Sequence, residues 1–110
     1  MAGFVKGDVV VLPFPYSDLS QAKRRPAVVV GVSSGPDVIL CQITSQTVTD
    51  GDALPLDSTA FASGALSKPS NVRPNKLFTA DSRIVLYQAG TLKQSVVDDM
   101  VKKIVEVLQR

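Results

Sequence analysis

Arg25 is the residue whose type and position best suit chemistry on a phosphate. It stands directly before Pro26, and the residue before a proline is biased toward extended backbone, which places Arg25 at the entrance of a strand. A guanidinium offers several hydrogen-bond donors in one fixed plane, which suits a phosphate. Lys23 and Arg24 precede it and complete a basic cluster. The spacing alone equally fits a solvated surface charge before a strand.

A pair of hydroxyl residues, Thr44 and Ser45, follows an apolar run further along the chain. Hydroxyls at the end of a strand are common turn formers. If the chain returns them to the Arg25 end of the sheet, they can instead hold a phosphate or orient a ribose hydroxyl.

The sequence contains no histidine and one cysteine, Cys41. The absence of histidine excludes Ser-His-Asp triads, Cys-His pairs and histidine-ligated zinc within this sequence, and one cysteine excludes a cysteine-only zinc site. We therefore expect no metal and no cofactor. Cys41 stands inside an apolar run, so we expect it to be buried and unreactive.

The chain of 110 residues has the size of a single domain, which we assign to residues 1–110. No apolar run approaches the roughly 18–20 residues that cross a bilayer, and the N-terminus lacks the pattern of a signal peptide. We expect a cytoplasmic protein with no membrane partner. A net charge of +2 permits a nucleic-acid partner without requiring one.

Apolar, β-branched runs predict the strands that would position Arg25 and Thr44. A short turn at 33–37 indicates a hairpin that returns Thr44 to the Arg25 end. Pro13 and Pro15 are expected to end the first strand, before a polar loop. The three strands are expected over Asp8–Phe14, Arg25–Val32 and Val38–Thr44.

The second half of the chain has weaker patterns, and residues 58–67 fit none of them. Gly90 is expected to interrupt the last strand. Aromatic residues are assigned to the core, except Tyr16, whose loop position suits stacking on a base. Four short strands are expected, at Ala53–Leu56, Ser70–Arg73, Leu77–Thr79 and Arg83–Tyr87.

The C-terminal segment predicts an amphipathic helix that covers the sheet, with Ser95 as its N-cap. Several short strands followed by one helix suggest a small barrel. The apolar face of the helix comprises Val96, Val97, Met100, Val101, Ile104, Val105 and Leu108.

Several motifs, in this order and spacing, resemble the MazF/PemK (Kid) toxins over nearly the whole chain. They are Gly7-Asp8-Val9-Val10, Arg24 to Val30, Ile43-Thr44-Ser45-Gln46, Val72 to Thr79, and the helix after Gly90-Thr91-Leu92. The resemblance implies an SH3-like barrel of the CcdB/PemK type with a C-terminal helix. It also implies a homodimer and the toxin of a type II toxin–antitoxin pair.

Most members of that family are metal-independent endoribonucleases of single-stranded RNA, which leave a 2′,3′-cyclic phosphate and a 5′-hydroxyl. The resemblance implies a MazE/PemI-like antitoxin that lays an acidic tail over the RNA groove. Operator DNA is expected as a partner only through the antitoxin complex.

Carried onto this sequence, the family's catalytic residues are Arg25 and Thr44. Because arginine is a poor proton donor, we favour electrostatic stabilisation of the transition state by Arg25 over general acid catalysis. The residues expected to contact RNA are Tyr16, Lys23, Arg24, Ser45, Gln46, Arg73 and Asn75.

Two departures from the family pattern affect the expected mechanism. Asn75 stands where some members carry an acid, and Ser20-Gln21 stands where many carry Glu-Gln. Asn75 cannot act as a base, so Asp18 is a candidate substitute acid. Two alternatives stay open: a CcdB-like toxin that acts on DNA gyrase without cutting RNA, and a degenerate toxin that only binds its antitoxin.

Overall fold

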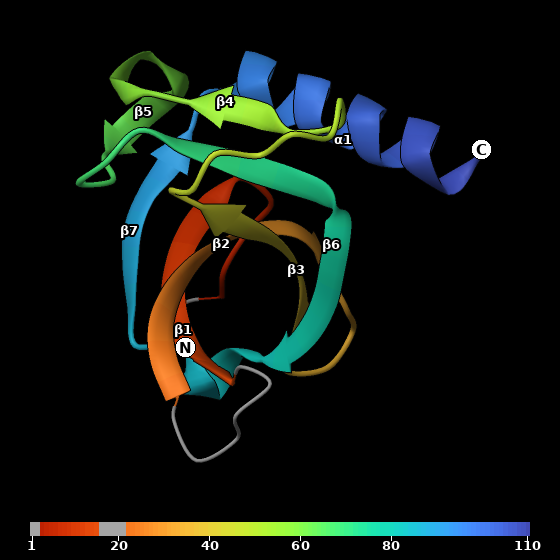
Figure 1. Ribbon diagram of the computed structural model, residues 1–110. Coiled ribbons are helices and arrows are strands. Elements are labelled where there is room, and N and C mark those ends of the chain that lie inside the picture. The colour runs from red at the N-terminus through yellow and green to blue at the C-terminus, as the bar shows by residue number, and fades with distance from the viewer. Residues whose placement is uncertain (1–2, 16–21) are drawn as a thin grey trace.

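The structure is a computed structural model that describes residues 3–15 and 22–110. Within these residues, seven antiparallel strands form one curled sheet in the spatial order β4-β6-β3-β2-β1-β7-β5. Figure 1 shows the sheet curling into a half-barrel with helix α1 across one end. The predicted mostly-β barrel with a C-terminal helix is confirmed. The elements are β1 (Asp8–Pro15), β2 (Ala22–Val32), β3 (Asp37–Thr44), β4 (Leu54–Leu56), the 3-10 turn η1 (Ser58–Ala60), β5 (Phe61–Gly64), β6 (Ser70–Asp81), the 3-10 turn η2 (Ser82–Ile84), β7 (Tyr87–Leu92) and α1 (Gln94–Leu108).

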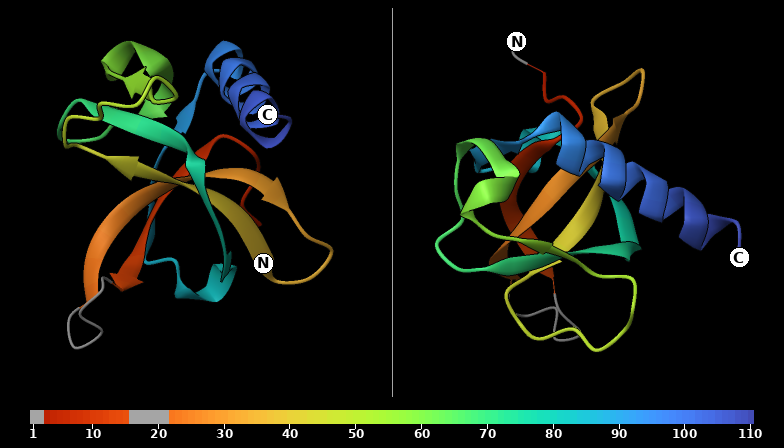
Figure 2. Two further views of the ribbon diagram at one scale, coloured as in Figure 1. Left: turned by 45° about the vertical axis from the view of Figure 1, so that its right-hand side comes forward. Right: turned by 90° about the horizontal axis from the view of Figure 1, so that it is seen from above.

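The sheet buries apolar side chains on both of its faces. One cluster packs under α1, whose Met100 is fully buried; Figure 2 shows the helix lying over that end of the sheet. The second cluster fills the inside of the curl, with Leu12 and Leu40 among its members. Because successive strand residues face opposite sides, Val28 joins the first cluster and Val29 the second. Burial on both faces explains the continuous apolar run in β2.

The β2–β3 hairpin forms as predicted and brings the Arg25 end of β2 next to the end of β3. The paired residues include Val28 with Cys41 and Ala27 with Gln42. Two residues beyond the Ala27–Gln42 pair, the strands reach Arg25 and Thr44, which confirms that the hairpin returns Thr44 to this end.

The predicted ends of the first two strands were wrong. β1 continues through both prolines to Pro15, and β2 already begins at Ala22, so the two strands pair as far as Pro15 and Ala22. The β1–β7 ladder ends at Val11, so the later part of β1 is an edge on that side. Proline is tolerated at such an edge because no neighbouring strand needs its missing N–H. Arg25 consequently lies within β2, opposite Leu12, rather than at its entrance.

β6 is one long strand rather than the two short ones predicted. Its register against β3 shifts between Arg73, which pairs with Gln42, and Leu77, which pairs with Cys41. Residues 74–76 form a bulge that takes up the shift, so Pro74 interrupts the ladder without ending the strand.

The last strand also begins later than predicted. Residues 82–84 form η2, with the Asp81 side chain accepting from the Arg83 N–H, and β7 starts at Tyr87. Gly90 lies inside β7 and pairs with Gly64 of β5. A Cβ on Gly90 would come within 2.5 Å of the Ser63 carbonyl oxygen, so glycine allows the two strands to approach.

Helix α1 begins one residue before the predicted N-cap Ser95, and Lys93 takes the cap position without a side-chain hydrogen bond. The Lys93 N–H instead donates to the Ala60 carbonyl, which joins the helix start to η1. Val105 and Leu108, predicted on the packed face, are exposed. No helix in the described ranges is long and apolar enough to cross a membrane.

Candidate functional site

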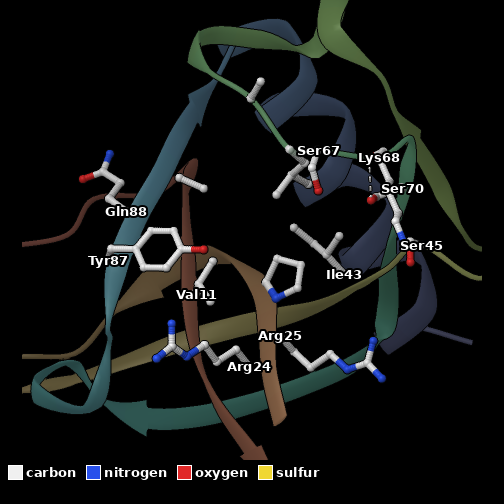
Figure 3. Close-up of a pocket in the computed structure, with 14 residues that line it drawn as sticks. Val11, Arg24, Arg25, Ile43, Ser45, Ser67, Lys68, Ser70, Tyr87 and Gln88 are labelled. Carbon is white, nitrogen blue, oxygen red and sulfur yellow. Dashed lines mark hydrogen bonds between the residues drawn. The ribbon is translucent and has the colours of Figure 1, made fainter.

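A pocket of about 580 Å³ opens at the Arg25 end of β2. Its walls come from β1, β2, β3 and β7, together with the segment that leads into β6 (Figure 3). Elements far apart in sequence therefore meet here. The lining residues are Val11, Arg24, Arg25, Pro26, Ile43, Ser45, Ala65, Leu66, Ser67, Lys68, Ser70, Tyr87, Gln88 and Ala89.

Arg24 and Arg25 extend to opposite sides of the pocket. Figure 3 shows Arg24 pointing toward the strand that carries Tyr87 and Arg25 pointing toward the side that carries Ser45. This follows from the alternation of side chains along β2. Arg24 is exposed, whereas Arg25 is half-buried.

The second predicted catalytic residue, Thr44, is the half-buried last residue of β3. Its hydroxyl accepts the N–H of Gln46 at 3.1 Å. Thr44 is outside the pocket lining because its neighbour Ile43 faces the pocket. Strand alternation puts Thr44 on the same face as Arg25, so the two share a sheet face as well as a sheet end.

Arg73 shares this face, because it pairs directly with Gln42, which is two residues from Thr44. Its Nη2 atom lies 3.0 Å from Oδ2 of Asp50. Two hydrogen bonds, first from the Asp52 N–H and then from Arg73, hold the pKa of the Asp50 carboxyl below its usual value. Sequence reasoning missed Asp50, since nothing in its local pattern distinguishes it from a turn residue.

The charge of the pocket is positive. Arg24, Arg25 and Lys68 line it, and no aspartate or glutamate is among its described lining residues. Ser45, Ser67 and Ser70 add hydroxyls, although that of Ser70 already donates to the Lys68 carbonyl at 3.0 Å. A cavity with three cations and no acid suits an anionic ligand such as a phosphodiester.

Tyr87 was assigned to the core, and this prediction was wrong. Its side chain is 53% exposed, and Figure 3 shows its ring directed into the pocket beside Val11. The prediction assigned aromatic residues to the core by type alone, whereas the structure places Tyr87 at the exposed start of β7. Sequence reasoning thus missed Tyr87 and Gln88, whereas Lys68 could have been found from the second basic stretch of the chain.

Among the other residues expected to contact RNA, those in the part of the chain that the structure describes do not line the pocket. Lys23 and Gln46 are exposed and outside the pocket lining, and Asn75 is exposed on the β6 bulge. Tyr16 and Asp18 lie outside the described residues.

Cys41 is fully buried in β3, as predicted, and its thiol donates to the Arg73 carbonyl at 3.0 Å. Burial raises the pKa of the thiol to about 12. A thiol in this state is a packing group and no nucleophile.

The sequence profile of PemK-like, MazF-like toxins of type II toxin–antitoxin systems matches residues 5–108. The chain belongs to this family. The match confirms the resemblance read from the motifs around Arg25 and Thr44. No curated protein sequence matches the chain.

Solved structures of low sequence identity share the fold. A mycobacterial endoribonuclease in complex with its cognate antitoxin is 14% identical, with a TM-score of 0.75 over 97% of this chain and 96% of that one. The MazF of a MazE–MazF structure from Deinococcus radiodurans is 21% identical, with a TM-score of 0.72 over 94% of each chain. A MazF toxin of Mycobacterium tuberculosis is 17% identical, with a TM-score of 0.68 over 91% and 96%.

Proposed function

We propose that this PemK/MazF-like toxin is a metal-independent, sequence-specific endoribonuclease that cleaves single-stranded RNA. The observation that carries the proposal is the acid-free pocket lined by Arg24, Arg25 and Lys68. Such a surface attracts the RNA backbone, and the exposed ring of Tyr87 offers a face on which a base can stack.

Cleavage by the RNA's own 2′-hydroxyl fits the groups present. The 2′-oxygen forms a bond to the adjacent phosphorus and loses its proton, while the bond to the 5′-oxygen breaks and that oxygen gains a proton. The products are a 2′,3′-cyclic phosphate and a 5′-hydroxyl. The half-buried Arg25 guanidinium stabilises the charge on the phosphorane oxygens, and the Thr44 hydroxyl adds a polar group on the same face.

Incubation of the purified protein with a diverse single-stranded RNA pool in EDTA, followed by sequencing of the ends, tests the proposal. We expect cuts at a short sequence with the two predicted end groups. Arg25→Ala is expected to lower kcat by about 10²–10³-fold, the range for loss of one preorganised charge-stabilising group. Arg83→Ala removes an exposed arginine outside the pocket lining and serves as the control. Intact RNA in EDTA, especially with inhibited gyrase supercoiling, contradicts the proposal.

We further propose a cytoplasmic homodimer that is neutralised by a cognate MazE/PemI-like antitoxin with an acidic segment. Operator DNA would be bound only through that complex. Support comes from the cationic pocket, which suits an acidic peptide, and from similar structures that contain an antitoxin. Light scattering tests the dimer, and competition between an acidic antitoxin peptide and RNA tests the shared surface.

A further inference from the structure

Two aspartates of the loop between β3 and β4 contact arginines that belong to different parts of the fold. Asp50 contacts Arg73 of β6, with Oδ2 and Nη2 3.0 Å apart. Asp52 contacts Arg110, which follows α1, through hydrogen bonds of 2.6 and 3.2 Å. The Asp52 N–H also donates to Oδ1 of Asp50 at 3.0 Å, so the loop backbone holds one oxygen of the Asp50 carboxylate while Arg73 holds the other.

The guanidinium of Arg73 has little freedom in this arrangement. Asp50 holds its Nη2 atom, and its Nε atom is enclosed by protein. The two side chains are only 26% and 33% exposed. An arginine that is held at Nη2 and packed around Nε has fewer accessible conformations for its remaining donors, which reduces the entropy lost when a phosphate binds.

Asp50 brings a carboxylate to Arg73 in a chain whose motif has Asn75 where some family members carry an acid. Asn75 is exposed on the bulge, whereas Asp50 reaches Arg73 from 23 positions away in the chain. Its lowered pKa makes it a weaker base than an ordinary aspartate, so it suits an ion pair better than proton transfer.

We propose that Asp50 is a positioning residue that orients Arg73, which lies outside the pocket lining, for RNA binding on the sheet face that it shares with Arg25 and Thr44. The role deepens the proposed ribonuclease function and rests on it. Asp50 contacts no substrate in this role; it acts only through the Arg73 guanidinium.

Positioning and net charge predict opposite effects on RNA affinity when the Asp50 charge is removed. Removal of a negative charge near an RNA site should tighten binding if only net charge matters. Loss of positioning should weaken it. We expect Asp50→Asn to weaken binding about tenfold, the scale of one charge-assisted hydrogen bond. KM should rise by a similar factor, with a smaller change in kcat.

The experiment measures the Kd of a single-stranded RNA that carries the cleavage sequence with a 2′-deoxy substitution at the scissile position. Asp52→Asn is the matched control, since it removes the same charge from the same loop and leaves the Arg73 contact in place. We expect its Kd to stay within about twofold, because Asp52 contacts Arg110 and its side chain makes no contact with Arg73. In an Arg73→Gln background, Asp50→Asn should cause no further loss of RNA affinity.

Three outcomes overturn the role. The first is an Asp50→Asn variant that binds RNA as well as or better than the parent, and the second is an equal loss of RNA affinity in Asp52→Asn. The third is a loss of RNA affinity from Asp50→Asn that is just as large in the Arg73→Gln background. Thermal unfolding confirms that each variant folds. Should Asp50→Asn not fold, Asp50→Glu replaces it: partial loss of affinity supports the role, and unchanged affinity overturns it. A parent protein that neither binds nor cleaves RNA overturns the proposed function itself.

Discussion

At the scale of single residues, Arg24 and Arg25 differ in burial and direction, which suits them to different roles in the proposed RNA cleavage. Arg24 is exposed and Arg25 half-buried, and they leave β2 in opposite directions. A partly desolvated cation stabilises developing charge more strongly than an exposed one. We therefore expect Arg25 to act on the reacting phosphate and Arg24 to attract the flanking backbone.

Arg24→Ala is expected to raise KM and leave kcat nearly unchanged. Because a single phosphate contact is lost, the slope of log binding constant against log salt concentration should fall by about 1. Titrations at several salt concentrations measure that slope. An unchanged slope, or a loss confined to kcat, would contradict the division between the two arginines.

Cys41 is expected to resist alkylation in the folded protein. Its pKa rises from 9.0 to about 12, so the thiolate fraction near pH 8 falls about a thousandfold, and its burial excludes the reagent as well. The rate of reaction with a thiol-specific disulfide reagent, measured with and without denaturant, checks this. Rapid labelling of the folded protein would show that β3 opens locally.

The sequence predicted Arg25, Thr44 and Arg73 as site residues because each belongs to a short motif, and the structure brings all three to one sheet face. Asp50 and Tyr87 were missed for physical reasons. The role of Asp50 depends on a long-range contact with Arg73, which no local pattern encodes. Tyr87 was misjudged because residue type alone assigned it to the core, whereas its exposure depends on its place at the start of β7.

At the scale of elements, η2 connects β6 to β7 through a charged cap. Asp81 accepts the Arg83 N–H at 2.9 Å and also contacts the Arg83 guanidinium. Hydrogen bonds from the Arg83 side chain, then its backbone, lower the pKa of Asp81 from 3.8 to about 2. The cap therefore contributes stability through the ionised carboxylate.

Since the pKa is lowered on folding, this contribution is fully present above about pH 4 and is lost as the pH falls from 3.8 toward 2. Asp81→Asn keeps an oxygen acceptor for the cap but has no charge. The Tm of the parent should exceed that of the variant at neutral pH, and the difference should shrink between pH 4 and 2. A difference in Tm that is constant down to pH 2 would contradict this assignment.

The errors in predicting strands arose where tertiary pairing overrides local signals. Pro13 and Pro74 are strand breakers by sequence, yet one lies on an edge and the other in a bulge. Gly90 weakens a strand by propensity, but its pairing with Gly64 requires the missing side chain. The existence of β1, β2 and β3 was predicted correctly, although the ends of β1 and β2 were not, because burial on both faces gives the continuous apolar runs that mark a central strand.

At the scale of the whole molecule, α1 closes the larger of the two apolar clusters. Met100 is 0% exposed there, together with strand residues such as Val28 and Ile43. The amphipathic pattern of this segment predicted both the helix and its covering role. Neither the curl of the sheet nor its strand order could be derived from that pattern, because both depend on pairings between distant segments.

Met100→Ala should lower the free energy of unfolding by about 2–5 kcal/mol, the cost of emptying a fully buried position. Val105→Ala, at a position 44% exposed on the same helix, is the control and should cost less than about 1 kcal/mol. Denaturant titrations give both values. Equal losses would mean that α1 is anchored by other residues.

The bulge in β6 frees position 75 from the pairing that fixes the rest of the strand. Register on either side is fixed by Arg73 with Gln42 and by Leu77 with Cys41, and the buried Pro74 anchors the chain between them. Asn75 and its neighbour lie outside these constraints. A substitution at Asn75 is therefore expected to change the chemistry on this surface while the barrel stays intact.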